Sequence, residues 1–245
     1  MANQVKVGLL TPHAAPGPEV EFPEMAPGRV ATQVARVSVA DGEMDRPPVS
    51  PTELRTAAAP GVLAKAAEGF ARGSIDVIGY ASTTSAYAIG ADVESAIVDR
   101  LSEHLAIPVA ATCLSAARAL RTLNADRVAL VHPPWFDDEL NELGAAYFRS
   151  QGCTVVSYAL ADLPNDPSRI EPDAVVGWVS RHVSDAAEAV FIGGNGFRCA
   201  GAIDALEELL GRPVLESNQV LLWSALAEIE ATLEVRGYGR IFASR

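Results

Sequence analysis

Ser82, Thr83 and Thr84 form a short polar loop that can bind an anion. The loop follows an apolar run at 75–81 and precedes a helix-like segment. Hydroxyl groups and backbone N–H groups at the start of a helix can converge on a carboxylate. A Ser/Thr turn that only caps the following helix would use the same residue types. Taken alone, this loop is therefore consistent with either a ligand-binding site or a simple helix cap.

A second loop, at 193–196, reads Gly-Gly-Asn-Gly. Glycine allows close approach of the backbone, so Gly194 and Gly196 can present N–H groups to an oxyanion, with Asn195 as a side-chain donor. A tight turn without a ligand is the alternative. Gly194 lies 112 positions after Ser82, and this equivalence between the two halves of the chain favours a joint ligand-binding role.

Two histidines and an arginine add acid–base and anion-binding groups near these loops. His132 ends the apolar run at 127–132, and because histidine titrates near neutral pH it is a candidate proton carrier. His13 holds the equivalent place after the first apolar run, which predicts a facing pair. Arg198 can hold a substrate carboxylate through two parallel hydrogen bonds. The alternatives are solvated histidines at strand ends and a surface salt bridge, and His104 and His182 are expected at the surface of helices.

Three further polar residues are candidate donors that orient a ligand. Thr112 follows the fourth apolar run, and Ser217 and Asn218 follow the eighth. Cys199, five residues beyond Gly194, is either a nucleophile that a loop shift brings in or a small buried residue. We favour the buried residue, since free cysteine commonly packs as a small apolar side chain.

Eight short apolar runs must position these residues. They are continuous rather than alternating, which is typical of strands buried on both faces of a parallel sheet. We predict strands at 5–10, 34–39, 75–81, 108–112, 127–132, 154–160, 189–194 and 213–217. Amphipathic stretches predict helices at 91–105, 137–152 and 202–211, with Asp137 as an N-terminal cap and with Gly152 and Gly211 as C-terminal stops. The chain is therefore expected to be an α/β protein.

The series of four strands occurs twice. Ile75 and Ala187 share the offset of 112, while Pro108 and Pro213 are 105 apart, so the halves differ only in loop length. We predict two pseudo-twofold-related lobes, each a four-stranded parallel sheet flanked by helices. The first comprises residues 1–113 plus 219–245 and the second 114–218. A ligand cleft should lie between them, at the carboxyl ends of the strands, where open α/β sheets bind ligands.

The Pro-rich stretch at 40–61 interrupts this regularity. An ordinary surface connection is the main expectation, and a mobile cover over the cleft is the alternative.

Composition excludes several classes of protein. The formal net charge is −12, which disfavours partners such as nucleic acid or an anionic membrane. No apolar run approaches the roughly 20 residues that span a bilayer, and the N-terminus lacks the features of a signal peptide, so we expect a cytoplasmic protein. The cysteines are an odd number, three, without CxxC spacing, which predicts reduced thiols and no metal site.

Several segments together resemble a known family. GYASTTSAYAIG (79–90), GGNGFR (193–198) and PVLESNQVLLW (213–223) are similar to the active-site segments of maleate cis-trans isomerases and arylmalonate decarboxylases, in the aspartate/glutamate racemase superfamily. The likeness extends over nearly the whole chain and includes GLLTPHAAPGPEVEF (8–22), where the family has a substrate-facing loop, and RVALVHPPW (127–135), where its second lobe begins. The resemblance implies an enzyme without cofactor or metal. Together with the apolar stretch at 220–229 it also allows a homodimer, although such a stripe is more typical of a core.

The sequence departs from this family at the reactive positions. The isomerases and racemases use two facing cysteines, and the decarboxylases keep the second one. Here Ser82 stands at the first position and Gly194 at the second, and His132 stands in the stretch where the family tends to place a tyrosine. Serine without an adjacent base is a far weaker nucleophile than a thiolate, so the thiol mechanism cannot be carried over.

We therefore predict an isomerase or lyase that acts on a small carboxylic acid through an oxyanion or enediolate, with His132, His13 and Ser82 as catalytic residues. Decarboxylation, elimination or hydrolysis suits these residues better than isomerisation of the maleate type, which needs a cysteine nucleophile. The alternative is a non-catalytic protein that binds a small carboxylate and has lost the thiols.

Overall fold

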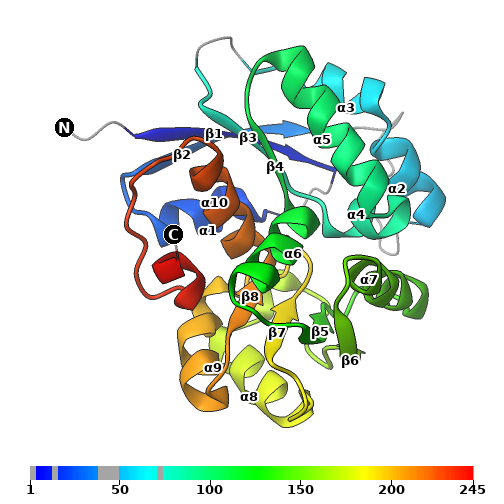
Figure 1. The fold of residues 1–245 in the computed structure, drawn as a ribbon, viewed down its shortest axis with the longest axis vertical. Coiled ribbons are helices and arrows are strands. Elements are labelled where there is room, and N and C mark those ends of the chain that lie inside the picture. Colours follow the sequence, from blue (N-terminus) through cyan, green and yellow to red (C-terminus); the bar gives the residue numbers. More distant parts are fainter. Residues whose placement is uncertain (1–3, 13–15, 38–49, 71–73, 245) are drawn as a thin grey trace.

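Two similar lobes make up the chain, in a computed structural model that describes residues 4–12, 16–37, 50–70 and 74–244. Within these residues each lobe holds one four-stranded parallel sheet, and the strand orders β2-β1-β3-β4 and β6-β5-β7-β8 are equivalent. Figure 1 shows the lobes one above the other, the first in blue to green and the second in green to orange. The predicted α/β fold with duplicated four-stranded sheets is confirmed.

The first lobe alternates strands and helices along the chain. Its elements are β1 (Val5–Thr11), α1 (Pro18–Met25), β2 (Val30–Arg36), α2 (Pro51–Ala57), α3 (Pro60–Ala67), β3 (Val77–Tyr80), α4 (Thr83–Ile89), α5 (Ala91–Leu105), β4 (Val109–Ala111) and α6 (Thr112–Thr122). Strands β3 and β4 are buried at every residue, because helices cover both faces of a parallel sheet.

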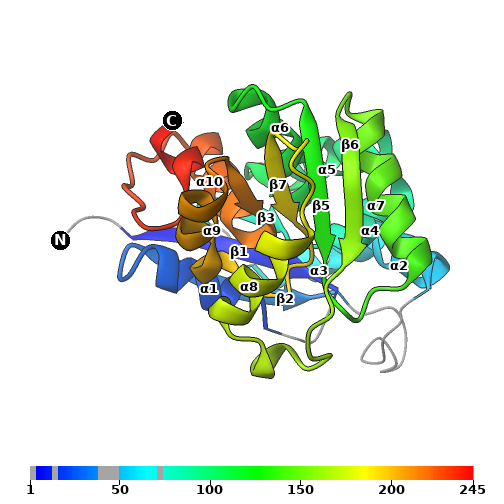
Figure 2. The same ribbon diagram turned by 90° about the horizontal axis from the view of Figure 1, so that it is seen from below.

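The second lobe repeats this pattern and ends in a long buried helix. Its elements are β5 (Arg127–His132), α7 (Asp138–Ser150), β6 (Thr154–Leu160), η1 (Pro167–Arg169), α8 (Pro172–His182), β7 (Ala189–Ile192), η2 (Ala200–Ala202), α9 (Ile203–Leu210), β8 (Val214–Glu216), α10 (Ser217–Glu228) and η3 (Arg240–Ser244). In the view of Figure 2, strands β6, β5 and β7 lie side by side.

The sequence located most of the strands and misplaced one. β5 and β6 begin and end at the predicted residues, whereas β2 covers Val30–Arg36 rather than 34–39. β2 is an edge strand with partly exposed residues, so polar side chains such as Thr32 and Gln33 are tolerated in it and the apolar run starts late. Residues 38 and 39 lie outside the described part of the chain.

Local signals fix the helix ends as expected. The side chain of Asp137 accepts a hydrogen bond from the N–H of Leu140 at 2.8 Å, which caps α7. Gly211 ends α9 with a φ of 67°, and Gly152 follows α7 with a φ of 85°, the left-handed conformation that glycine adopts without a steric penalty.

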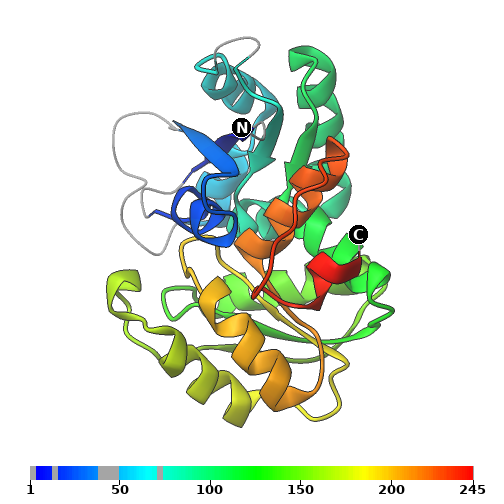
Figure 3. The same ribbon diagram turned by 90° about the vertical axis from the view of Figure 1, so that its left-hand side faces the viewer.

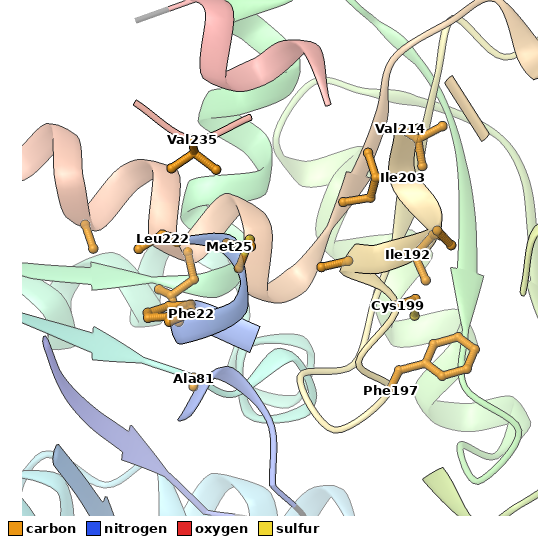
Figure 4. Close-up of a cluster of buried hydrophobic side chains, with 14 of the residues drawn as sticks. Phe22, Met25, Ala81, Ile192, Phe197, Cys199, Ile203, Val214, Leu222 and Val235 are labelled. Atoms are coloured by element: carbon orange, nitrogen blue, oxygen red, sulfur yellow. The ribbon is translucent and has the colours of Figure 1, made fainter. Parts of the chain in front are cut away.

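Helix α10 joins the lobes. It follows β8 of the second lobe, yet it packs against β3, β4 and α6, and Figure 3 shows it rising from the lower lobe into the upper one. Apolar side chains of α10 and α1 share one core with those of the second lobe, and Figure 4 shows Phe22, Met25 and Leu222 together in it. The apolar stretch at 220–229 is mostly core within this chain. The lobe boundaries expected at residues 113 and 218 stay a prediction.

Candidate active site

Thr83 and Asn195, which the duplication places at equivalent positions, meet between the lobes. The backbone N–H and the hydroxyl group of Thr83 donate to Oδ1 of Asn195 at 3.1 and 3.0 Å. The hydroxyl oxygen of Thr83 accepts from the backbone N–H of Gly194 at 3.2 Å. Both side chains are fully buried. The structure therefore brings the two donor-rich loops into direct contact.

Three of the other predicted donors surround this pair. The side-chain amide of Asn195 donates to Thr112 Oγ1 at 3.1 Å and to Asn218 Oδ1 at 2.9 Å. Ser217 Oγ lies 3.2 Å from Thr83 Oγ1. We call these five residues, Thr83, Thr112, Asn195, Ser217 and Asn218, the inter-lobe cluster. Its members are buried and bonded to one another, so a rigid set of donors and acceptors lies at the junction of the lobes.

Glu21 on α1 extends this cluster with a titratable group. Its Oε2 accepts from the side-chain amide of Asn218 at 2.6 Å, and its Oε1 accepts from the backbone N–H of Ala200 at 2.8 Å. Burial raises the pKa of Glu21 above the usual glutamate value, although both hydrogen bonds act in the opposite direction. A carboxyl group with such a pKa can exchange a proton near neutral pH.

A second buried carboxyl group, Glu216, lies at the end of β8. Its Oε2 accepts from the backbone N–H groups of Asn218 and Gln219 at 2.8 and 2.9 Å, which caps α10. Its Oε1 is buried and has no hydrogen-bond partner within the described residues. Burial raises the pKa of Glu216 well above its usual value, and the charge of Glu21 raises it further. The charge on each of these carboxyl groups opposes ionisation of the other, so the two resist simultaneous ionisation.

A pocket of about 200 Å³ opens beside Glu21, between the lobes. Its polar lining includes Glu21 and Glu24 from α1 together with Ser168 and Arg198 from the second lobe. Nε of Arg198 is buried without a hydrogen-bond partner in the part of the chain that the structure describes. The predicted anion-binding arginine therefore lies in a pocket at the lobe interface.

Sequence reasoning missed Glu21. The segment contains Pro16, Pro18 and Pro23, and the family resemblance implies a loop there. In the structure Pro18 starts α1, at a position where proline is tolerated. The signal that was available is the spacing of Phe22 and Met25, which predicts one apolar helix face that also includes position 21.

His132 ends β5 as expected but lies in a closed environment. The hydroxyl group of Tyr87 donates to Nε2 across 2.9 Å, and Nδ1–H donates to Oδ1 of Asn141 across 2.7 Å, a tautomer assigned from these partners. The ring is fully buried and stacks on Phe136. Burial lowers the pKa of His132 to about 4, so the imidazole is neutral and both nitrogens are engaged.

The remaining predicted residues fall into different surroundings. Ser82 is buried and caps α4, because its oxygen accepts from the N–H of Ser85 at 3.2 Å. Thr84 and Gly196 are partly exposed neighbours of the inter-lobe cluster. His13 lies outside the described residues, as do residues 40–49 of the stretch at 40–61.

Position 194 has no room for a side chain. A Cβ atom on Gly194 would lie 2.9 Å from Cγ of Pro133, and the φ of 99° is one that other residues rarely adopt. The space next to this loop, where the family resemblance expects a cysteine, is therefore filled by a proline ring.

Cys113 and Cys199 do not supply that thiolate in this structure. Cys113 and Cys199 are fully buried, and burial raises the pKa of both thiols well above the usual value. Figure 4 shows Cys199 within the apolar core beside Ile192 and Phe197. Both groups are therefore protonated thiols, which are poor nucleophiles.

No group of three or more His, Cys, Asp or Glu side chains that could hold a metal ion occurs in the described ranges. Among those residues no helix combines the length and the apolar character that crossing a bilayer requires.

An α/β fold with two equivalent lobes and a buried, titratable polar cluster at their junction is typical of enzymes that act on small molecules. The sequence from residue 57 to 242 matches the family model for arylmalonate decarboxylase, which covers well over half of the 245 residues. The chain therefore belongs to the arylmalonate decarboxylase family, a family of isomerase- and lyase-type enzymes. No curated protein matches the chain.

Solved structures show the same fold over nearly the full length. An arylmalonate decarboxylase matches with a TM-score of 0.81 at 19% identity, covering 98% of this chain and 100% of that one. A maleate isomerase from Pseudomonas putida gives 0.84 at 22%, with 98% of both chains covered. A maleate cis-trans isomerase from Nocardia farcinica, a cysteine-to-serine variant with a covalently bound succinylcysteine intermediate, gives 0.84 at 22%, covering 99% of this chain and 100% of that one.

Proposed function

We propose that this protein is a cofactor-independent lyase or isomerase that acts on a small carboxylic acid without a catalytic thiol. The observation that carries the proposal is the contact between equivalent loops of the two lobes, where the N–H groups of Thr83 and Gly194 and the hydroxyl group of Thr83 lie together in a buried site. Such donors stabilise negative charge that develops on a carboxylate or enolate oxygen.

The chemistry follows from this donor set. Loss of CO₂ or of a proton next to a carboxylate leaves an electron pair that delocalises onto oxygen as an enediolate. A charged oxyanion makes stronger hydrogen bonds than the neutral acceptors that the Thr83 and Gly194 donors use in this structure. The donors can therefore change partners when the charge forms.

Decarboxylation or elimination is favoured over isomerisation of the maleate type. The Nocardia farcinica structure contains a succinylcysteine, whereas here Ser82 and Gly194 stand at the positions that the family resemblance gives to cysteines. The catalytic roles predicted for His132, His13 and Ser82 stay predictions. In this structure His132 and Ser82 are both engaged by neighbouring side chains.

A non-catalytic carboxylate-binding protein is the second candidate. The observation in its favour is that the inter-lobe cluster satisfies its own hydrogen bonds, for example between Asn195 and Thr112 and between Asn195 and Asn218. Such a protein would bind a small acid and release it unchanged.

Proton NMR in D₂O tests the proposal. The protein, dialysed against EDTA, is incubated with malonates, maleate, hydroxy acids and amino acids, and conversion or deuterium incorporation is followed. We expect at least one acid to react, and Thr83→Val to slow that reaction about 100- to 1,000-fold because an oxyanion donor is removed. Thr122→Val, on the exposed face of α6, is the matched control and should react at the wild-type rate.

Two results would count against an enzyme. Line broadening of an added acid without any conversion favours the carboxylate-binding protein. Equal rates for wild type, Thr83→Val and Thr122→Val would show that the Thr83 hydroxyl group of the inter-lobe cluster takes no part in the reaction.

A further inference from the structure

The pocket beside α1 combines an acid–base group, a cation and a smaller apolar part. Glu21 is buried at 3% relative exposure and still lines the pocket. Val20, Pro167, Ile170 and Pro172 supply the apolar part of the lining. Its volume of about 200 Å³ is enough for a small acid with a compact substituent, since a cavity of about 150 Å³ holds benzene.

Arg198 is the free cation of this pocket among the described residues. Its Nε is buried and unpartnered, and its backbone has a φ of 54°, which is unusual for a residue with a side chain. Unsatisfied buried donors are rare, and strained backbone concentrates at ligand sites. A carboxylate that accepts from Nε and from one terminal nitrogen would satisfy this donor through two parallel hydrogen bonds.

Hydrogen bonds connect this pocket to the inter-lobe cluster. Glu21 is bonded to Asn218, Asn218 to Asn195, and Asn195 to Thr83. The carboxyl group in the pocket and the oxyanion donors therefore belong to one continuous polar network.

We propose that Glu21 is the proton-transfer residue of this enzyme and that Arg198 binds the carboxylate of its substrate, a small carboxylic acid with a compact apolar substituent. This inference rests on the function proposed above. Neither residue is a thiol, so the pair provides an acid–base route that needs no cysteine.

The proton-transfer step balances without a further reactant. The O–H bond of protonated Glu21 breaks, and the electron pair of the enediolate forms a C–H bond at the α-carbon. The enediolate returns to a carboxylate, and Glu21 is left as a carboxylate. Water restores its proton before the next turnover, and the reverse step removes an α-proton.

Neighbouring groups from several elements determine how Glu21 titrates. The carboxyl groups of Glu24 and Glu216 oppose its ionisation, while Arg198 favours it. Cys199 and Tyr238 also lie near Glu21, and its charge raises the pKa of both groups. We expect the reaction rate to depend on one group that titrates above the usual glutamate range, and this dependence should disappear in Glu21→Gln.

Binding is measured first, with malonate as the probe. In ¹H–¹⁵N NMR titrations at pH 7 we expect malonate to shift the signals of Gly201 and its neighbours. Arg198→Gln should weaken binding at least 10-fold and Arg198→Lys less, while Arg100→Lys, on the exposed face of α5, should bind as wild type does. Unchanged affinity in Arg198→Gln would overturn the carboxylate site.

Turnover separates proton transfer from binding. With the acid that reacts in D₂O, Glu21→Gln should lower kcat about 100- to 10,000-fold with KM within threefold, and Glu21→Asp should restore part of the rate. Glu208→Gln, an exposed residue of α9, is the control. Glu21→Gln alters a buried hydrogen-bond network and can impair folding. Arg198→Gln changes a partly exposed residue, so it tests the pocket independently of whether Glu21→Gln folds.

The outcomes distinguish this inference from the proposed function. If Thr83→Val abolishes conversion while Glu21→Gln and Arg198→Gln convert normally, the function stands and the roles of Glu21 and Arg198 are wrong. If wild type converts no acid, the proposed function fails and proton transfer by Glu21 fails with it. The malonate titration of Arg198→Gln then still decides whether the pocket is a carboxylate site.

Discussion

Pro133 occupies the space that a side chain at position 194 would need. We expect Gly194→Cys to be destabilised by about 1–3 kcal/mol from overpacking and further by its φ of 99°. Pro133→Ala removes the ring atoms that a new Cβ would meet, so Gly194→Cys combined with Pro133→Ala should recover part of the loss. Urea unfolding of the two single variants and the double variant measures this coupling. Strictly additive losses would show that Pro133 does not restrict this position.

Substitution of the buried His132 by leucine should affect stability in two ways. His132→Leu leaves the Tyr87 hydroxyl and Asn141 Oδ1 without their buried partner, and each such group costs about 1–3 kcal/mol. In addition, the folded-state pKa of about 4 lies below the unfolded value of 6.5. Protonation of the unfolded chain at this histidine therefore costs wild type stability as the pH falls from 6.5 toward 4, while the buried carboxyl groups act in the opposite direction over the same range. The stability difference between wild type and His132→Leu isolates the histidine, and it should shrink as the pH falls.

Thermal unfolding at pH 7 and pH 5 checks both effects. His104→Leu on the exposed face of α5 is the control and should keep the acid dependence of wild type. If the stabilities of His132→Leu and His104→Leu change by the same amount between pH 7 and pH 5, His132 does not contribute to the pH dependence.

At the scale of elements, Gly17 determines how closely α1 approaches the second lobe. A Cβ atom at this position would lie 2.6 Å from the backbone oxygen of Asn195, and neither group is a flexible side-chain end. Gly17→Ala must therefore shift α1, which carries Glu21, and we expect a loss of about 1–3 kcal/mol together with reduced turnover. Gly61→Ala in α3, where nothing lies within 4 Å, should leave turnover unchanged and stabilise by up to about 1 kcal/mol. Equal behaviour of both variants in urea unfolding and in the NMR assay would contradict this packing role.

Elements with a strong local pattern were predictable from the sequence, and elements defined by tertiary contacts were not. Strand β6 and helix α5 have the predicted bounds because their apolar patterns and end signals agree. β2 was misplaced because an edge strand needs no continuous apolar run. α1 was missed because eight residues with two prolines carry little helical signal, and packing against α10 stabilises the helix instead.

The candidate site was likewise predictable where the sequence repeats itself and unpredictable where tertiary contacts decide. The offset of 112 between the halves predicted that the loops of Thr83 and Asn195 are equivalent, and the structure shows them in contact. The spacing of Phe22 and Met25 places Glu21 on the apolar face of a helix, but no sequence pattern shows its hydrogen-bond partners or that Nε of Arg198 lacks one among the described residues. Both properties depend on the docking of α1 on the second lobe.

At the scale of the whole molecule, three buried carboxyl groups oppose folding at high pH. Burial raises the pKa of Glu94 to about 8, although a hydrogen bond from Tyr147 lowers it, and burial also raises the pKa of Glu21 and Glu216. Over this range the folded state holds protons that the unfolded state has released. The contribution of these three carboxyl groups to the free energy of unfolding is therefore fully present below about pH 4.5, and it is lost as the pH rises toward 8.

His132 acts in the opposite direction only below pH 6.5, so between pH 6.5 and 8.5 the carboxyl groups decide the outcome. We expect wild type to lose stability over this interval, with about 2 kcal/mol from Glu94 alone. Glu94→Gln keeps an acceptor for Tyr147 and cannot ionise, so it should lose less, while Glu139→Gln on the exposed face of α7 should match wild type. Because the chain carries a formal charge of −12, urea unfolding is done in about 0.3 M NaCl, where repulsion between distant surface charges is screened. A wild-type stability that rises between pH 6.5 and 8.5 would show that these carboxyl groups are already ionised in the folded protein.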